Sequence, residues 1–260
     1  MIKNKRILLI GASGGLGQAM ARSFDDAGAK LVLHGHSNKL ALDELRSTLD
    51  NVAGNLVGDI TAEDDVISVI QDAVGYMGGI DAIVIAAGIN PSAHSIVDTP
   101  AVEWRRILDV NLTGPFLCLK HGVPYLKRTE SRRGGKVVII SSIFAVQSPP
   151  NRAAYGASKH GLTGLVQSAS KEFGGPNSDI HINAVCPGPV WGPNVYNIFV
   201  KAAEEVGVTV EEYSKRRLLK IPAGRFLDAK ELAALVMFLC SDSSDYINGQ
   251  VLNITGGAIE

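Results

Sequence analysis

Short apolar stretches rich in β-branched residues alternate along the chain with longer segments of helical spacing. The apolar stretches are residues 7–10, 31–33, 80–86, 137–140, 180–185 and 251–254. Runs of this length that are apolar on both faces are typical of buried parallel strands. The segments with helical spacing are residues 16–27, 39–49, 64–77, 102–126, 154–173 and 229–239. The hydrophobic pattern therefore predicts an α/β protein.

Regular alternation of strand and helix predicts right-handed crossovers and a doubly wound parallel sheet in three layers, with helices on both faces. No change of composition suggests a linker, so we expect one domain over residues 1–260. In such folds ligands bind beyond the carboxyl ends of the strands. Residues 190–222 break the alternation, and we interpret them as a substrate lid; a surface helix pair is the equally weighted alternative.

Charge and cysteine content narrow the class of protein. The 25 basic and 26 acidic residues nearly cancel, so neither nucleic acid nor an anionic membrane is an expected partner. Cys118, Cys186 and Cys240 lie far apart, which favours buried reduced thiols over disulfides or a metal site, and we expect no metal. The basic start of the chain precedes an apolar run of only four residues, too short for a signal peptide or a membrane span. We therefore expect a cytoplasmic protein.

A glycine-rich turn connects the first predicted strand to the first predicted helix. It reads Gly11-Ala12-Ser13-Gly14-Gly15-Leu16-Gly17. Glycines let the backbone turn sharply and approach a pyrophosphate, whose charge meets the free N–H groups at the start of the helix. Glycines in a turn can also serve only a tight connection. Their place between the first strand and the first helix favours phosphate binding.

A second motif places a phenol and an ammonium on one face of a helix. Tyr155 and Lys159 are four residues apart, which is one helical turn. A free tyrosine has a pKa near 10, and we expect the ammonium of Lys159 to lower the pKa of Tyr155 so that the phenol can exchange protons near neutral pH. The alternative is a half-exposed helix start in which the spacing has no role.

The order of these motifs along the chain resembles the short-chain dehydrogenase/reductase family, whose fold is a Rossmann-type sheet. The glycines follow the family spacing at Gly11, Gly15 and Gly17, and Ser142 stands thirteen residues before Tyr155. The resemblance extends over essentially the whole chain and includes Asp59, Asn111 and the segment Pro187-Gly188-Pro189-Val190.

The resemblance implies roles for these residues. Tyr155 would be the acid/base, Ser142 would bond the substrate oxygen, Lys159 would also hold the nicotinamide ribose, and Asn111 would anchor a water that leads to solvent. Ser141 is the rival to Ser142, and an ordinary mid-helix asparagine is the alternative for Asn111. The expected cofactor-binding residues are Gly11, Ser13, Gly14, Gly15, Leu16, Gly17, His36, Ser37, Asp59, Ile60, Ala87, Gly88, Asn111, Tyr155, Lys159, Pro187, Gly188 and Val190.

The end of the second strand bears on the choice of cofactor. An NAD-binding protein places an acid about 20 residues past the glycines, and here the chain reads His34-Gly35-His36-Ser37. An acid would repel a 2′-phosphate, so its absence favours NADP(H), with NAD(H) as the alternative. An exposed His36 with no role is the other interpretation.

The predicted substrate rests on residues in segments that line the pocket in relatives, and the predicted assembly rests on two long helices. Phe144, Asn151 and Trp191 lie in such segments and favour a small polar hydroxy or oxo compound, such as a sugar, polyol or hydroxy acid, over a steroid. The alternatives are a 3-oxoacyl carrier-protein reductase, a cofactor-retaining epimerase or dehydratase, and a dinucleotide-binding sensor without turnover. Relatives pair the helices expected at 102–126 and 154–173 between subunits, so we expect a homodimer or homotetramer.

Overall fold

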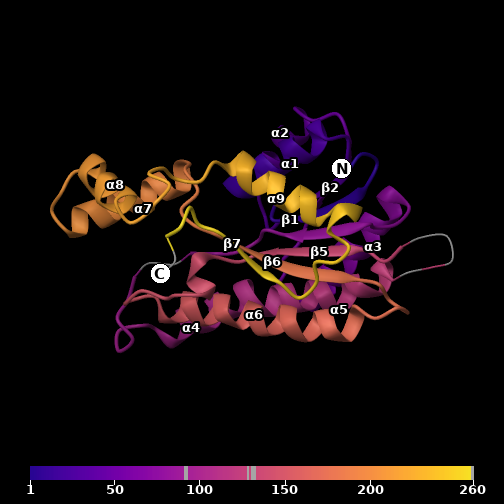
Figure 1. The fold of residues 1–260 in the computed structure, drawn as a ribbon. Coiled ribbons are helices and arrows are strands. Elements are labelled where there is room, and N and C mark those ends of the chain that lie inside the picture. Colours follow the sequence, from indigo (N-terminus) through magenta and orange to yellow (C-terminus); the bar gives the residue numbers. More distant parts are fainter. Residues whose placement is uncertain (91–92, 128, 130–132, 259–260) are drawn as a thin grey trace.

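The computed structural model describes residues 1–90, 93–127, 129 and 133–258 and contains a seven-stranded sheet in the order β3-β2-β1-β4-β5-β6-β7 (Figure 1). Every neighbouring pair of strands is parallel. The strands are β1 (Arg6–Ile10), β2 (Lys30–Gly35), β3 (Val52–Val57), β4 (Ala82–Ile85), β5 (Lys136–Ile140), β6 (His181–Pro187) and β7 (Val251–Ile254). The Rossmann-type, doubly wound sheet predicted from the sequence is therefore confirmed.

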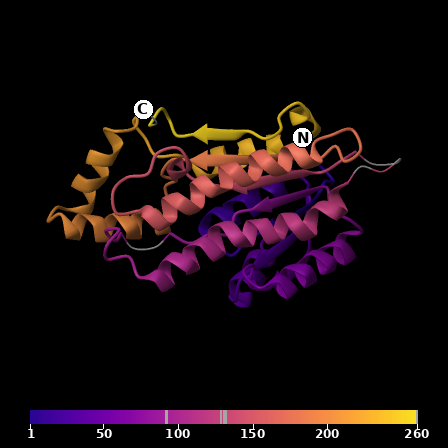
Figure 2. The ribbon, with the colours of Figure 1, turned by 90° about the horizontal axis from the view of Figure 1, so that it is seen from below.

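Helices cover both faces of this sheet, as the two views show (Figures 1 and 2). Helices α1, α2 and α9 lie on one face, and α3 to α6 lie on the other. Their bounds are α1 (Gly15–Asp26), α2 (Lys39–Arg46), α3 (Glu63–Met77), α4 (Ala101–Leu108), α5 (Gly114–Leu126), α6 (Ala153–Phe173) and α9 (Ala229–Leu239). Because both faces are covered, the central strands are apolar on both sides, which is the pattern the sequence showed.

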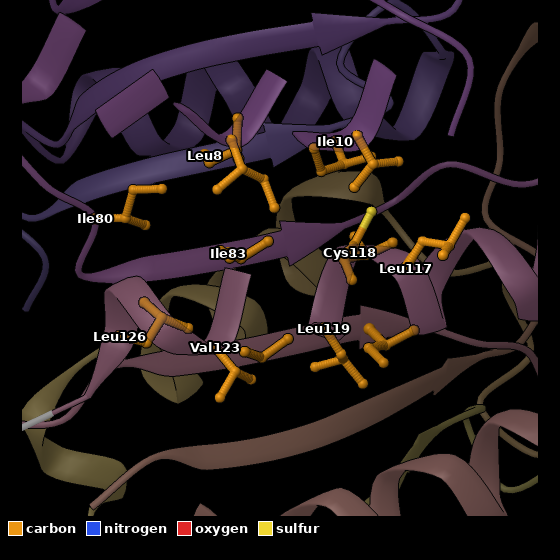
Figure 3. Close-up of a cluster of buried hydrophobic side chains, with 14 of the residues drawn as sticks. Leu8, Ile10, Ile80, Ile83, Leu117, Cys118, Leu119, Val123 and Leu126 are labelled. Atoms are coloured by element: carbon orange, nitrogen blue, oxygen red, sulfur yellow. The ribbon is translucent and has the colours of Figure 1, made fainter. Parts of the chain in front are cut away.

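The core consists of two apolar clusters, one on each face of the sheet. The cluster between the sheet and α3, α5 and α6 is the larger, and Figure 3 shows a part of it in which Leu8 and Ile83 of the strands face Leu119 and Val123 of α5. A Cβ atom on Gly122 would lie 2.4 Å from the Ile83 side chain. The missing side chain at this position therefore lets α5 approach the sheet closely.

Two local features differ from the hydrophobic pattern. The pattern did not show β3, because this edge strand carries Asn55 and Gly54 and is only half buried. The expected helix over residues 102–126 contains a π-helical turn (Asp109–Thr113) between α4 and α5. Turns of this kind are local widenings of a helix and occur frequently at functional sites. Asn111 lies in this turn.

Residues 190–222 form a lobe beyond the end of the sheet, made of α7 (Pro193–Glu205) and α8 (Val210–Leu218) (Figure 1). Aromatic rings join its two helices and the segment that follows them: Phe199 of α7 contacts Tyr213 of α8 and Phe226 edge-on, with centroids 5.3 Å and 5.5 Å apart. The chain enters and leaves the lobe side by side, since Val190 and Leu227 form a parallel bridge. In the described part of the chain, no helix is both long and apolar enough to cross a membrane.

One buried polar side chain makes the stability of the fold depend on pH. His34 in β2 is 1% exposed, and its Nε2 atom hydrogen-bonds the carbonyl of Gly58, 3.0 Å away. Burial lowers the pKa of His34 to about 4, because the charged imidazolium is poorly solvated inside the protein. In the unfolded chain the same side chain is protonated below its ordinary pKa of about 6.5.

We predict that the contribution of His34 to the free energy of unfolding is complete above about pH 6.5. Between about pH 6.5 and pH 4, protonation of this histidine in the unfolded chain should lower the free energy of unfolding by about 3 kcal/mol, since one pKa unit corresponds to 1.36 kcal/mol. His34→Gln, which keeps an N–H donor for Gly58, is expected to flatten this pH dependence in urea unfolding experiments. His160→Gln, at an exposed position, is the control and should leave it unchanged. An equally steep profile in His34→Gln and wild type would contradict the assignment.

Candidate active site

The site lies where β1 and β4 are neighbours at the centre of the sheet. The chain leaves β1 toward one face, through α1, and leaves β4 toward the other face, through α4. Opposite crossovers leave a crevice at the carboxyl ends of the two strands, and this is where open α/β sheets bind ligands. The predicted motifs after β1, β4, β5 and β6 all lie along this edge.

The glycine turn after β1 brings two backbone segments closer than side chains would permit. Gly11 has a φ of +88°, and a Cβ on it would lie 2.5 Å from the Ala87 nitrogen. A Cβ on Gly17 would lie 2.1 Å from the Gly11 oxygen. Both positions therefore require glycine. Ala87, which follows β4, is placed directly against the turn.

The start of α1 fits a pyrophosphate. The helix begins at Gly15 after the N-cap Gly14, no side chain caps its N–H groups, and its first turn holds no acid. These donors and the positive end of the helix dipole are free to meet negative charge. Leu16 packs on the core below, and a Cβ on Gly35 would lie 2.9 Å from the Ser13 hydroxyl, so Ser13 borders the end of β2.

The ends of β2 and β3 bring together four of the expected cofactor-binding residues, His36, Ser37, Asp59 and Ile60. His36 Nε2 lies 3.5 Å from a carboxylate oxygen of Asp59, and both side chains are exposed, as is Ser37. The backbone and hydroxyl of Thr61 donate hydrogen bonds to Asp59 and lower the pKa of its carboxyl group. Ile60 is buried beneath. The carboxylate is thus held in place, with an imidazole beside it.

Asn111 is fully buried and bonds the loop that follows β4. Its side-chain oxygen accepts from the Ile89 nitrogen at 2.8 Å, and its amide nitrogen donates to the Ile89 oxygen at 2.9 Å. A Cβ on Gly88 would lie 3.3 Å from the Asn111 oxygen and 3.7 Å from Lys159 Nζ. The structure therefore brings Gly88, Asn111 and Lys159 together. The ordinary interpretation of a mid-helix asparagine is that it bonds its own helix or faces solvent. In the structure the Asn111 side chain does neither.

Ser142 and Tyr155 meet at the end of β5. The Ser142 hydroxyl interacts with the Tyr155 phenol, which favours the ionised phenol, and it accepts a hydrogen bond from the Phe144 nitrogen at 3.2 Å. The ring of Phe144 packs edge-on against that of Tyr155, with centroids 5.5 Å apart. Ser141 points away, and its hydroxyl contacts the Lys159 carbonyl at 3.5 Å. Geometry thus favours Ser142 over its rival as the partner of the phenol.

Lys159 lies beneath the phenol, with Nζ 5.7 Å from the centroid of the Tyr155 ring. It is buried, donates to the Ile140 carbonyl at 3.1 Å, and burial lowers its pKa to about 8. Burial also raises the pKa of Tyr155, against the opposing effects of the Ser142 hydrogen bond and the Arg152 charge. The expectation that Lys159 lowers the phenol pKa is therefore not met in the protein alone. The same desolvation that raises the pKa of the phenol weakens the ammonium that would lower it.

The segment after β6 connects the sheet to the lobe of α7 and α8. Pro187 ends β6, and the Gly188 nitrogen donates to the Ile254 carbonyl at 3.0 Å. Val190 is buried against the core, whereas Trp191 is 49% exposed and stacks on Phe226 with centroids 5.0 Å apart. Trp191 thus belongs to the aromatic cluster of the lobe.

Asn151 has a φ of +63°, and its carbonyl accepts from the His94 nitrogen at 3.2 Å. This bond joins the loop before α6 to the segment that follows β4. Its side chain is exposed at the turn into the helix that carries Tyr155. Asn151 therefore stands close to the phenol in the chain, on the solvent side of the site.

Sequence reasoning missed two side chains of the site. The charge of Arg152 acts on the Tyr155 phenol, and the hydroxyl of Ser158 accepts a hydrogen bond from the Asn111 amide at 3.2 Å. Both lie next to the motif: Arg152 is the N-cap of α6, three residues before Tyr155, and Ser158 directly precedes Lys159. Among the residues described, no group of three or more His, Cys, Asp or Glu side chains could hold a metal ion.

Comparisons with known proteins agree with this geometry. Residues 11–258 match the family model described as "Enoyl-(Acyl carrier protein) reductase". The chain is 33% identical to a 3-oxoacyl-[acyl-carrier-protein] reductase of Thermotoga maritima, over 99% of both chains. It is 30% identical to a D-beta-hydroxybutyrate dehydrogenase of Rhizobium meliloti, over 97% of this chain and 98% of the relative.

A solved structure is similar to this chain in both fold and sequence. The crystal structure of NAD⁺-bound xylitol dehydrogenase superposes with a TM-score of 0.90 at 28% identity, and the match covers 98% of this chain and 99% of that one. Sequence order, sheet topology and site geometry thus lead to one family. The chain belongs to the short-chain dehydrogenase/reductase family and is an NAD(P)-dependent oxidoreductase acting on CH–OH and C=O groups.

Proposed function

We propose that this protein interconverts a hydroxy and an oxo group of a small polar compound, with Tyr155 as the proton donor and acceptor. The observation that carries the proposal is the interaction of the Tyr155 phenol with the Ser142 hydroxyl, which favours the phenolate, with the Lys159 ammonium below the ring. A phenol held by a second hydroxyl can exchange a proton with a substrate oxygen that binds between them. The set Asn111, Ser142, Tyr155 and Lys159 would carry out this chemistry.

Each residue would have a distinct task. A bound nicotinamide supplies or accepts the hydride. The Ser142 hydroxyl would donate to the substrate oxygen where negative charge develops, and Tyr155 would pass its proton to that oxygen during reduction and remove it during oxidation. Lys159 would bond the ribose hydroxyls and favour the phenolate, and Asn111 would keep the adjoining loop in place. The oxidised nicotinamide ring carries a positive charge, which would offset the raised pKa of the buried phenol.

The cofactor would be NADP(H) rather than NAD(H). The residues proposed to bind it are those of the glycine turn, His36 and Ser37, Asp59 and Ile60, and the segments that follow β4 and β6. No acid stands at residues 34–37 to repel a 2′-phosphate, and the exposed His36 imidazole, 3.5 Å from Asp59, would offer an N–H donor to one. His36 would therefore decide the preference.

The substrate would be small and polar, such as a hydroxy acid, a sugar or a polyol. Phe144 stands against the Tyr155 ring and narrows the space above the phenol, which disfavours a steroid. Asn151 and Trp191 would offer an amide and an aromatic face at the rim. The hydroxybutyrate and xylitol dehydrogenases among the similar proteins act on compounds of this size.

A 3-oxoacyl thioester is the second candidate. The Thermotoga maritima relative is named for this activity, and Lys215, Arg216 and Lys220 are exposed near the end of α8, where an acidic carrier could dock. Arg216 is engaged with Glu212 of the same helix. This group of exposed basic residues is small, so a small polar substrate remains the favoured one.

The lobe of residues 190–222 would act as the substrate lid, and the protein would work as a homodimer or homotetramer in the cytoplasm. Exposed apolar side chains on the helices that cover one face support assembly: Val102 on α4, and Phe116 and Tyr125 on α5. Three buried, unpaired cysteines suit a reducing compartment.

We expect a screen that follows nicotinamide absorbance to find turnover with D-3-hydroxybutyrate, xylitol or an aldohexose, in preference to an acetoacetyl thioester. Tyr155→Phe should lower kcat by about 10²- to 10⁴-fold, because proton transfer is lost, and leave NADPH binding within about twofold. Tyr246→Phe, at a fully exposed tyrosine, is the control. Near-normal turnover by Tyr155→Phe would contradict the proposal, and product formation without net absorbance change would favour an epimerase or dehydratase.

His36→Asp should raise the Kd for NADPH by at least about tenfold, because a carboxylate repels the 2′-phosphate, while the Kd for NADH changes much less. Fluorescence titration of both reduced cofactors measures this, with NADH as the internal control for an intact site. Tighter binding of NADH than NADPH by the wild type would overturn the assigned preference.

Lys159→Met should remove turnover and stabilise the protein. Lowering the lysine pKa from 10.5 to about 8 means that the buried charge costs about 3 kcal/mol of folding free energy at pH 7. Methionine removes this cost, but it also removes the hydrogen bond to the Ile140 carbonyl, which reduces the gain in stability by about 1 kcal/mol. The cost of the buried charge is complete below pH 8 and fades as pH rises toward 10.5, so the gain should be smaller at pH 9.5. Lys171→Met, exposed on the same helix, should show no such gain in urea unfolding.

A further inference from the structure

A single hydroxyl group connects three elements around the site. The Ser158 hydroxyl donates to the Tyr155 carbonyl at 2.7 Å and accepts from the Asn111 amide nitrogen at 3.2 Å. Asn111 in turn bonds both the nitrogen and the oxygen of Ile89 in the loop after β4. Ser158 and Asn111 are both fully buried. The hydroxyl thus joins the first turns of α6, the π-helical turn and the exit of β4.

The bonding capacity of these groups leaves little freedom. A serine hydroxyl has one proton to donate, and here it is given to the Tyr155 carbonyl, which orients the oxygen lone pairs toward Asn111. An asparagine amide has two N–H bonds, and these go to the Ile89 oxygen and to Ser158. Removal of the hydroxyl would leave one buried N–H without its partner, and a buried polar group cannot turn to solvent for compensation.

The connected elements carry the groups that act on the cofactor and the substrate. Lys159 follows Ser158 directly in the chain, and Tyr155 lies one turn before it on the same helix. Gly88 faces both the Asn111 oxygen and Lys159 Nζ. A shift of α6 against the π-helical turn would therefore move the phenol and the ammonium relative to the loop after β4.

We propose that Ser158 is a positioning residue, whose hydroxyl ties the turn that carries Asn111 to α6 and so fixes Tyr155 and Lys159 against the loop after β4. This inference rests on the proposed function for its kinetic consequences only. A misplacement of reacting groups by about 1 Å can cost up to about 10²-fold in rate, although the residue responsible touches neither substrate nor cofactor.

The test compares two serines of α6. Ser170 also donates to a carbonyl three residues before it, at 3.1 Å, and is also buried, but it lies at the far end of the helix. Ser158→Ala should lower kcat by about tenfold or more, leave the KM for NADPH within about twofold, and move the ascending limb of the kcat pH profile for oxidation to higher pH. Ser170→Ala should change none of these. Ser158→Thr, whose hydroxyl can bond the same carbonyl, should restore most of kcat.

Crystal structures of both variants test the proposal independently of enzymatic activity. In Ser158→Ala the Asn111 amide should leave its present position or the π-helical turn should change its hydrogen bonding, whereas Ser170→Ala should preserve both. An unchanged Asn111 in Ser158→Ala overturns the proposal, even if no substrate is found. Equal effects of Ser158→Ala and Ser170→Ala on kcat and the pH profile, or no rescue by threonine, overturn it as well. Absence of turnover in the wild type would instead count against the proposed function.

Discussion

Parallel pairing of all seven strands is the constraint on which the rest of this molecule depends. Because the strands run in one direction, every carboxyl end reaches the same edge of the sheet, and each returning helix must cover a face. The glycine turn after β1, the Asn111 contact after β4, and Ser142 after β5 are therefore neighbours although they are far apart in the sequence. The reversal between β1 and β4 opens the crevice into which they face.

Burial makes the site costly to build. The sheet and helices bury Lys159 and partly bury Tyr155, and this desolvation lowers the pKa of the ammonium and raises that of the phenol. Both shifts oppose the charge states that the proposed chemistry uses. Lys159 is held by its hydrogen bond to the Ile140 carbonyl, and the Ser142 hydroxyl acts on the Tyr155 phenol in favour of the phenolate. In the protein alone, burial thus disfavours the charged forms of both groups.

The groups proposed for proton transfer and the lobe proposed as the substrate lid belong to different parts of the fold. Groups proposed for proton transfer lie at strand ends and on α6, which are held by the sheet, whereas the lobe of α7 and α8 lies beyond the end of the sheet, where Trp191 packs on Phe226. Rigid elements suit the chemistry, and an excursion that packs mainly on itself can vary without disturbing them. Relatives at about 30% identity accordingly carry names of different substrates on one fold.

The sequence by itself determined the sheet, the order of its helices and the motifs of the crevice, because these depend on periodicity and short-range spacing such as that of Tyr155 and Lys159. It did not show β3, whose edge position tolerates polar residues, nor the π-helical turn, which follows from packing. The spacing to Tyr155 already favoured Ser142 over Ser141, but only the tertiary structure showed that the Ser141 hydroxyl contacts the Lys159 carbonyl and that Ser158 bonds Asn111. Contacts between distant residues, and the desolvation that sets the pKa of Lys159, depend on the surrounding fold, and local patterns do not encode them.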